Sequence, residues 1–209
     1  MIIQPVVQQP GPTMIRVARI FAFAILTILS ANPTLAAEHY LIDTKGMHAF
    51  ITFRVKHLGF SWLEGRFNRF RGTFDYDASD PNANKVNVEI DLTSLDTNHA
   101  ERDKHLRSSR FFDVKTFPQA TFVSTAWEDK GDGKALLRGR FTLRGVSRDI
   151  EIEVHHLGAG PDPWGGYRRG FEGTTTLHLS DYKMREAKIL GPNAEEIKVW
   201  LSIEGVRHP

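Results

Sequence analysis

The stretch "KVNVEIDL" (residues 85–92) decides how this chain folds, because polar and apolar side chains alternate in it without a break. A period of two is typical of a β-strand that buries one face and exposes the other. The buried set would be Val86, Val88, Ile90 and Leu92, and the exposed set Asn87, Glu89 and Asp91. The stretch therefore predicts a strand in a sheet with one dry and one wet face.

The same alternation recurs through most of the chain after residue 38. It is found at 49–55, 70–76, 120–126, 135–143, 146–154, 171–179 and 197–203, with a short additional candidate at 40–43. The segments between are rich in Gly, Pro, Asp and Asn, as in "DASDPNAN" (77–84), "DKGDG" (129–133), "GAGPDPWGG" (158–166) and "LGPNAEE" (190–196). Eight one-sided strands joined by short connectors predict an antiparallel meander in one domain.

A sandwich and a barrel are both compatible with this meander, and two features favour the barrel. The strands follow one another by short connections, which suits an up-and-down closure. Small residues such as Gly72, Gly139 and Gly173 stand among large ones on the dry faces, where they relieve crowding. We predict an all-β fold, a single eight-stranded antiparallel up-and-down barrel with one short helix between strands.

An eight-stranded barrel is just wide enough to be filled by its own side chains or to hold one slender ligand. Alternation alone leaves both possibilities open. If a ligand is held, the dry-face residues replace water around it. The predicted lumen residues are Ile51, Phe53, Phe74, Val88, Phe122, Phe141, Ile152, Leu177 and Val199.

Residues 14–37 have the three parts of a secretory signal. Two arginines are followed by a short apolar run at 20–29, and small residues offer a cleavage site near Ala36 or Ala37. A membrane anchor is the weaker interpretation, because a spanning helix needs about 20 apolar residues. We therefore predict an N-terminal extension with a cleavable signal peptide at 1–37 and a periplasmic barrel domain at 38–209.

The charge and the cysteine content exclude several classes of protein. Only two of the 27 Lys and Arg residues, and none of the 25 Asp and Glu residues, precede Glu38, so the predicted mature chain is electrically neutral. A nucleic-acid-binding surface needs a basic face, so we expect no nucleic-acid partner. The chain has no cysteine, which excludes disulfides, thiolate metal sites and cysteine nucleophiles.

One segment, "DTNHAERDKHLRSSRFF" (96–112), departs from the strand pattern. Asn98 followed by Glu101 fits an N-cap and its capping partner, and 99–107 then form about two helical turns. Apolar residues of the same region, Phe111 among them, would anchor the helix over one end of the barrel. The segment is predicted to be a short helical lid.

The charges of this lid have two interpretations. They pair with one another and with strand ends, or Arg102, His105 and Arg107 hold a polar head group, since the planar donor fork of arginine matches phosphate oxygens. A metal site at His99, Asp103 and His105 is disfavoured, because histidines six residues apart do not share a helical face. We predict no metal.

Two connectors carry exposed aromatic residues. "HLGFSW" (57–62) places Phe60 and Trp62 beside Gly59, and "DPWGG" (162–166) places Trp164 in a turn. These rings either plug the barrel ends or form a portal that touches a membrane. Catalytic motifs such as a nucleophile elbow or a phosphate loop are absent from the sequence, so we predict a protein that is not an enzyme.

The chain resembles a known family over its whole predicted mature length. The resemblance rests on "HAFITFRVKHLGFSWLEGRFNRFRGTFDYD" (48–77), "SLDTNHAERDKHLRSSRFFDVKTFPQATFVST" (94–125), "FTLRGVSRDIEIEV" (141–154) and "DPWGGYRRGFEG" (162–173). These segments are similar to the YceI family of periplasmic proteins. The resemblance implies a lipocalin-like barrel that binds a long isoprenoid or another amphiphilic chain.

The predicted function is thus periplasmic binding of an apolar or amphiphilic chain, a polyisoprenoid lipid in first place, for transport, storage or sequestration. The alternatives are an envelope stress or interaction protein with a filled barrel and an enzyme on isoprenoid or quinone-like substrates. We expect a lipid or amphiphile ligand but no cofactor, transient contact with a membrane surface, and a monomer or homodimer.

Overall fold

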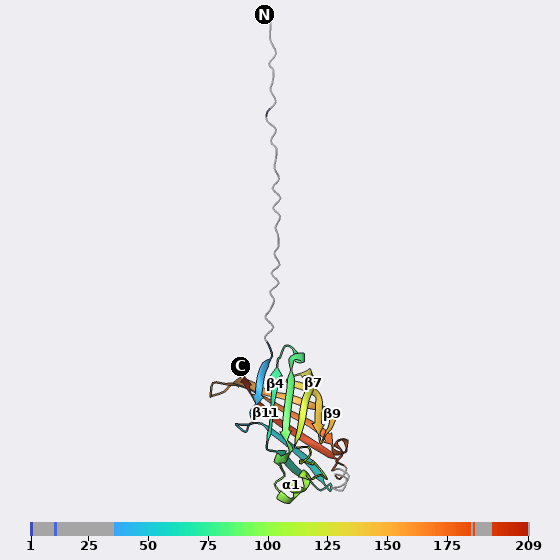
Figure 1. The fold of residues 1–209 in the computed structure, drawn as a ribbon. Coiled ribbons are helices and arrows are strands. Elements are labelled where there is room, and N and C mark those ends of the chain that lie inside the picture. Colours follow the sequence, from blue (N-terminus) through green and yellow to red (C-terminus); the bar gives the residue numbers. More distant parts are fainter. Residues whose placement is uncertain (2–10, 12–35, 185, 187–193, 209) are drawn as a thin grey trace. The chain divides into compact units, whose positions relative to one another are not determined.

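The structure is a computed structural model that describes residues 36–184, 186 and 194–208, together with Met1 and Gly11. Residues 35–209 form one compact unit, and Figure 1 shows its strands wrapped around a common interior. The predicted signal peptide lies outside the described residues, except that Ala36 and Ala37 directly precede the first strand. Among the described residues, no helix is long and apolar enough to cross a membrane.

The described residues form eleven strands, one α-helix and three single-turn 3₁₀ segments. The strands are β1 (Glu38–Ile42), β2 (Phe50–His57), β3 (Ser61–Phe67), β4 (Phe70–Tyr76), β5 (Lys85–Asp91), β6 (Leu95–Asp96), β7 (Gln119–Gly131), β8 (Lys134–Leu143), β9 (Val146–Pro161), β10 (Tyr167–His178) and β11 (Glu196–His208). The helix is α1 (Ala100–Arg107), and the 3₁₀ segments are Pro81–Ala83, Leu92–Ser94 and Leu179–Tyr182.

The eleven strands occupy eight strand positions of a closed barrel, because three of these positions are each shared by two short strands. β1 and β2 follow one another along the same edge of β11, where Ile42 pairs with Gly205 and Phe50 with Ser202. β3 and β4 share a second strand position in the same way, and β5 and β6 share a third. The sheet runs through β4, β5, β7, β8, β9, β10 and β11, and the β1–β11 pairing closes it with every pair antiparallel. The predicted eight-stranded up-and-down barrel is confirmed.

The prediction missed β3 and ended some strands too early. "HLGFSW" is not one connector, because Trp62 belongs to β3 and pairs with Lys56. Gly65 interrupts the apolar face of β3 between Leu63 and Phe67 and hides its alternation. A Cβ at Gly65 would collide with the ring of Phe53, so tertiary packing accounts for the glycine. Residues 158–161 likewise belong to β9 rather than to a connector.

The helix forms where it was predicted, but its cap lies one residue later. His99 is the N-cap, and its Nδ1 accepts a hydrogen bond from the backbone N–H of Arg102 at 3.2 Å. Asn98 instead has a left-handed backbone with φ of 61°. The buried Asp103 accepts bonds from the backbone N–H and hydroxyl of Thr97, at 2.9 and 2.5 Å. This contact draws the chain back at Thr97 and requires the turn at Asn98.

Candidate functional site: the barrel lumen and its two ends

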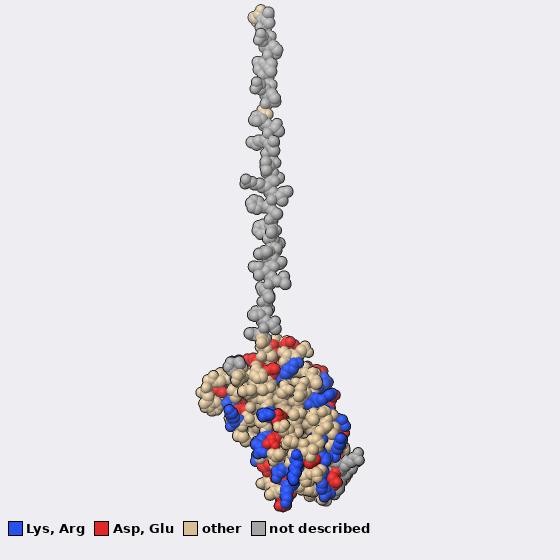
Figure 2. Space-filling model, in the orientation of Figure 1, with Lys and Arg blue, Asp and Glu red and all other residues tan. Residues whose placement is uncertain are grey.

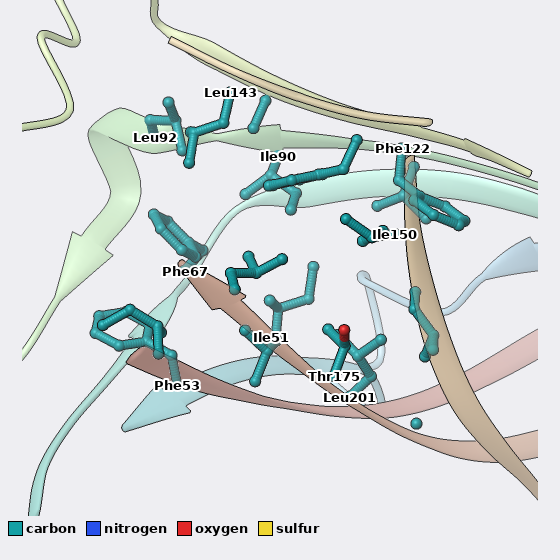
Figure 3. A pocket seen from close by; sticks show the side chains of 18 of the residues that line it. Ile51, Phe53, Phe67, Ile90, Leu92, Phe122, Leu143, Ile150, Thr175 and Leu201 are labelled. Carbon is teal, nitrogen blue, oxygen red and sulfur yellow. The ribbon is translucent and has the colours of Figure 1, made fainter. Parts of the chain in front are cut away.

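The barrel encloses a cavity of about 350 Å³ whose wall is almost entirely apolar. Figure 3 shows side chains from strands on different sides of the barrel, including Ile51, Phe122 and Leu201, around the same space. All nine residues predicted to face the lumen line this cavity, namely Ile51, Phe53, Phe74, Val88, Phe122, Phe141, Ile152, Leu177 and Val199. The barrel is therefore not filled by its own side chains.

The register of the strands explains why these residues meet. Val88 of β5 pairs with Phe122 of β7, which in turn pairs with Phe141 of β8. Because alternate side chains point to the same face, residues paired in register form an inward layer across three strands. Gly139 of β8 pairs with Ser124 of β7, and a Cβ at Gly139 would collide with the ring of Phe122. The missing side chain at Gly139 therefore leaves room for the Phe122 ring in the cavity wall.

At one end of the lumen, which we name the closed end, Tyr76 lines the cavity and belongs to a cluster with Glu38, Tyr40 and Arg169. The guanidinium of Arg169 lies 4.1 Å above the Tyr76 ring and donates to the Tyr40 hydroxyl and to Glu38, both at 3.1 Å. Burial raises the pKa of Glu38, but hydrogen bonds from Tyr40, Arg207 and Arg169 outweigh burial and lower this pKa from 4.5. The cation is thus paired within a packed aromatic layer.

The opposite end, the open end, is lined by Lys56, His57, Arg102 and His105. His57 and His105 line the cavity and are also exposed, so the cavity meets solvent here. Lys56 and His57 were not among the predicted site residues. Their signal in the sequence was weak, since they only mark the last positions of β2 before the turn.

The three predicted head-group residues of α1 lie in different places. Arg102 lines the cavity and donates from Nε to the Thr97 hydroxyl at 2.7 Å and from Nη2 to the Thr97 carbonyl at 2.6 Å. His105 lines the cavity and packs edge-on against Phe111, with 5.0 Å between ring centres. Arg107 does not line the cavity and donates to the Leu95 carbonyl at 2.9 Å. Both arginines therefore fasten the helix to β6 and the segment after it.

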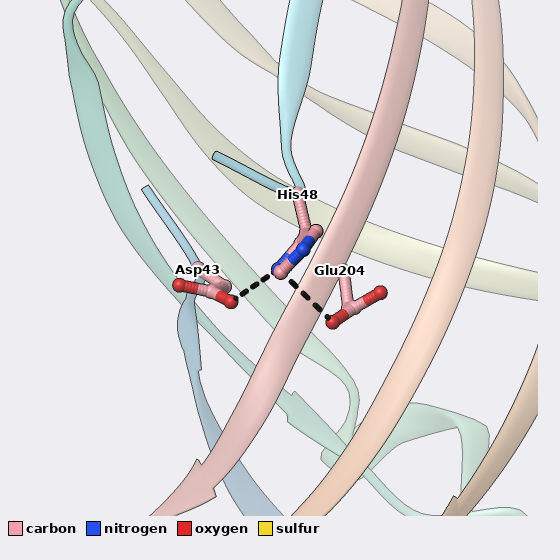
Figure 4. A group of neighbouring side chains, drawn as sticks. All are labelled: Asp43, His48 and Glu204. Atoms are coloured by element: carbon pink, nitrogen blue, oxygen red, sulfur yellow. Dashed lines mark hydrogen bonds and ion pairs between the residues drawn. The ribbon is translucent and has the colours of Figure 1, made fainter. Parts of the chain in front are cut away.

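A cluster on the barrel wall brings together groups able to bind a metal: Asp43, His48 and Glu204 (Figure 4). His48 Nδ1 lies 2.9 Å from an Asp43 oxygen, and Arg168 donates to the same oxygen at 2.6 Å and also contacts Glu204. Burial raises the pKa of Asp43, but hydrogen bonds from His48, Arg168 and Gly46 lower it to about 2. Because Arg168 already pairs with both carboxylates, we interpret the cluster as an ion-pair network that fastens the segment after β1.

Known proteins resemble this chain in sequence and in fold. The model of the YceI-like domain matches residues 40–205, which include all or part of every strand of the barrel. The chain belongs to the YceI family. A UPF0312 protein of Shewanella sp. (strain MR-7) is 49% identical to this YceI protein over 189 residues, which are 90% of this chain and 98% of the relative.

Two solved structures place this YceI chain among known barrels. A YceI protein of Campylobacter jejuni matches with a TM-score of 0.66 and 27% identity, over 74% of this chain and 91% of that protein. A polyisoprenoid-binding domain from Saccharophagus degradans matches with a TM-score of 0.58 and 16% identity, over 82% of this chain and 99% of that domain. The second likeness concerns the fold alone.

Proposed function

We propose that this YceI protein binds a long apolar chain with a polar head, of the polyisoprenoid class, inside its barrel and acts as a periplasmic carrier or store. The observation that carries the proposal is the apolar cavity of about 350 Å³ that meets solvent among polar side chains at the open end. Such a volume lies within the range of small-molecule sites. The polyisoprenoid-binding domain from Saccharophagus degradans has the same fold, which supports this ligand class.

The proposed mechanism is passive. Apolar wall residues replace water around the tail, and each methylene that leaves water contributes about 0.8 kcal/mol, or about fourfold in affinity. Ordering of the tail and its withdrawal from a membrane oppose this gain, so the affinity does not grow without limit. We expect affinity to rise with chain length and to level off when the lumen is full.

The polar head would remain at the open end. Arg102 uses Nε and Nη2 for its contacts with Thr97, and its Nη1 makes no hydrogen bond within the described part of the chain. An anionic head group would fit this free donor. His105, Lys56 and His57 line the same opening and add further donors.

The alternatives make different demands on the lumen. A barrel that acts only through its surface needs no cavity, and the open lumen counts against it. An enzyme needs a reactive polar group within reach of the tail. The wall offers few polar groups, and one of them, the Thr175 hydroxyl, already donates to the Glu151 carbonyl at 2.6 Å. Binding without turnover is therefore the proposal, in a protein exported by the signal predicted at 14–37.

The first test is to purify the protein from the periplasm and to identify the contents of its organic extract by mass spectrometry. We expect a stoichiometric isoprenoid or similar amphiphile. The second test measures the affinity of delipidated protein for isoprenyl alcohols of increasing length by fluorescence titration. A series with no dependence on length, together with an extract free of lipid, would contradict the proposal.

A matched pair of variants locates the ligand. Val88→Trp places a large ring in the cavity and is expected to weaken binding of the longest alcohol at least about tenfold, since several methylenes lose their place. Val123→Trp changes a half-exposed valine on the next strand, outside the cavity lining, and is expected to leave binding unchanged. Equal losses in both variants would show that the chain is bound elsewhere.

A further inference from the structure

The outer face of β2, β3 and β11 carries a cluster of cations and indole rings. Arg54 lies over both Trp62 and Trp200, at 4.6 and 4.1 Å from the ring centres, and the ammonium groups of Lys56 and Lys198 lie 4.7 and 5.7 Å from Trp62. The neighbours of these residues along the strands line the lumen, so the cluster itself points outward. We name Arg54, Lys56, Trp62, Lys198 and Trp200 the docking face.

The charges of the docking face differ from those on the rest of the wall. On β4 and β8, arginines pair across strands with carboxylates, as in Arg71 with Glu89 and Arg140 with Asp149. Within the described residues, the three cations of the docking face have no carboxylate partner within ion-pair distance. Figure 2 shows basic and acidic side chains intermixed over the visible face, including the end of the barrel that Figure 1 labels with α1. The docking face is thus a local excess of positive charge, although Glu64 pairs in register with Arg54 on the neighbouring strand.

The turn beside this face exposes apolar side chains at its tip. Phe60 is 87% exposed and Leu58 is 51% exposed. The left-handed backbone of Leu58, with φ of 52°, is accounted for by the tight turn that Leu58 and Gly59 make between β2 and β3. Packing within the barrel does not account for the exposure of the two apolar side chains. An apolar tip flanked by cations and indoles is the composition of a segment that inserts at a membrane interface.

The tip and the docking face adjoin the open end of the lumen. Lys56 is part of the docking face and also lines the cavity, and His57, next in the chain, lines it as well. A surface that rests on the docking face would therefore lie against the opening. This continuity selects a source of lipid as the occupant rather than a protein or a nucleic acid.

We propose that the docking face and the tip residues Leu58 and Phe60 bind the surface of an anionic phospholipid bilayer and hold the open end of the barrel against it. The cations contact lipid phosphates, the indoles lie at the head-group level, and Phe60 enters the acyl boundary. This inference deepens the proposed function by naming the surface from which a tail would enter. It is nevertheless testable without any ligand in the lumen.

The test is cosedimentation of the full mature protein with vesicles of phosphatidylglycerol and phosphatidylcholine in equal parts, and with vesicles of phosphatidylcholine alone. We expect binding to the anionic vesicles only, and weaker binding as salt is raised. The variant Arg54→Gln/Lys198→Gln removes two cations that lie outside the cavity lining, and we expect at least about a tenfold loss of vesicle affinity.

The matched control is Lys85→Gln/Lys134→Gln, which removes the same charge from two exposed lysines at the starts of β5 and β8. It is expected to keep wild-type vesicle binding. For the apolar tip, Phe60→Ser should weaken binding severalfold, whereas Trp164→Ser, at another exposed aromatic residue, should not. Equal losses in test and control variants, or equal binding to neutral vesicles, would overturn the proposal.

A second readout separates this inference from the proposed function. Binding of a short, water-soluble isoprenyl alcohol is expected to be the same in Arg54→Gln/Lys198→Gln and in the wild type, because neither residue lines the lumen. Vesicle binding without any alcohol binding would contradict the lumen function and leave the docking face supported. Alcohol binding without vesicle binding would do the reverse.

Discussion

The two ends of the barrel differ in the contacts that their buried or half-buried cations make. At the closed end, Arg169 is 12% exposed and contacts Glu38 and Tyr40 of β1 and Tyr76 of β4. At the open end, Arg102 is held only by Thr97, five residues away on the same segment, and Lys56 has no carboxylate partner within the described residues. Long-range pairing makes one end rigid, whereas the other keeps donors free for a ligand or a surface.

This difference has a physical reason. A closed barrel needs its first and last strands to stay paired, and β1 meets β11 at the closed end, where His39 pairs with His208. Cross-strand ion pairs and stacked rings there stabilise the closure itself. At the open end, Arg102 and His105 of α1 line the cavity beside Lys56 and His57 of β2. A ligand could pass through such an end without breaking strand pairs or disrupting the core.

The largest expected effect is loss of stability in Arg169→Leu. The change removes the cation that lies on Tyr76 and donates to the Tyr40 hydroxyl, and it leaves Glu38 with Arg207 but without Arg169, so we expect a loss of about 3 kcal/mol in the free energy of unfolding. Urea denaturation followed by tryptophan fluorescence measures it. The counterpart at the open end is Lys56→Gln, which should change stability by about 0.5 kcal/mol or less. Similar losses in both variants would abolish the distinction between the ends.

A smaller effect is expected on ligand selectivity in Arg102→Gln. If its free Nη1 holds an anionic head, the variant should bind an isoprenyl phosphate about tenfold more weakly and the alcohol of the same length equally well, a difference of about 1.4 kcal/mol. Calorimetric titration with both ligands measures this. Arg107→Gln is the matched control, since Arg107 lies on the same helix but not on the cavity wall. A parallel loss for phosphate and alcohol would instead indicate a displaced helix.

The smallest effect is a change in acid sensitivity from Glu38→Gln. The pKa of Glu38 is lowered in the folded protein, so the stability that its charge contributes is present above about pH 4.5 and is lost as pH falls through the folded pKa. Glu38→Gln should therefore be less stable than wild type at neutral pH, and the gap should narrow below pH 4.5. Thermal unfolding at a series of pH values measures the gap. A gap independent of pH would mean that the charge of Glu38 contributes nothing to the closed end.

Much of this architecture could be predicted from local pattern. Alternation at period two depends only on which residues prefer water. It therefore located most strands of the barrel and the nine predicted lumen residues, all of which line the cavity. The strand β3 escaped because Gly65 has no side chain to mark its dry face. The cap of α1 was misplaced because the bonds from Thr97 to Asp103, which determine where the helix begins, join residues six apart in the chain.

The sequence by itself determined the class of fold, the inward set of side chains, the likeness to a family and the position of the charged helix, since each depends on residues that are neighbours in the chain. Only the tertiary structure decided that the lumen is open at one end, that Arg107 lies away from it, and that Arg54, Trp62 and Trp200 form one face. These features depend on pairings between residues far apart in the sequence, such as Trp200 with Thr52. Strand register, which no local pattern encodes, brings them together.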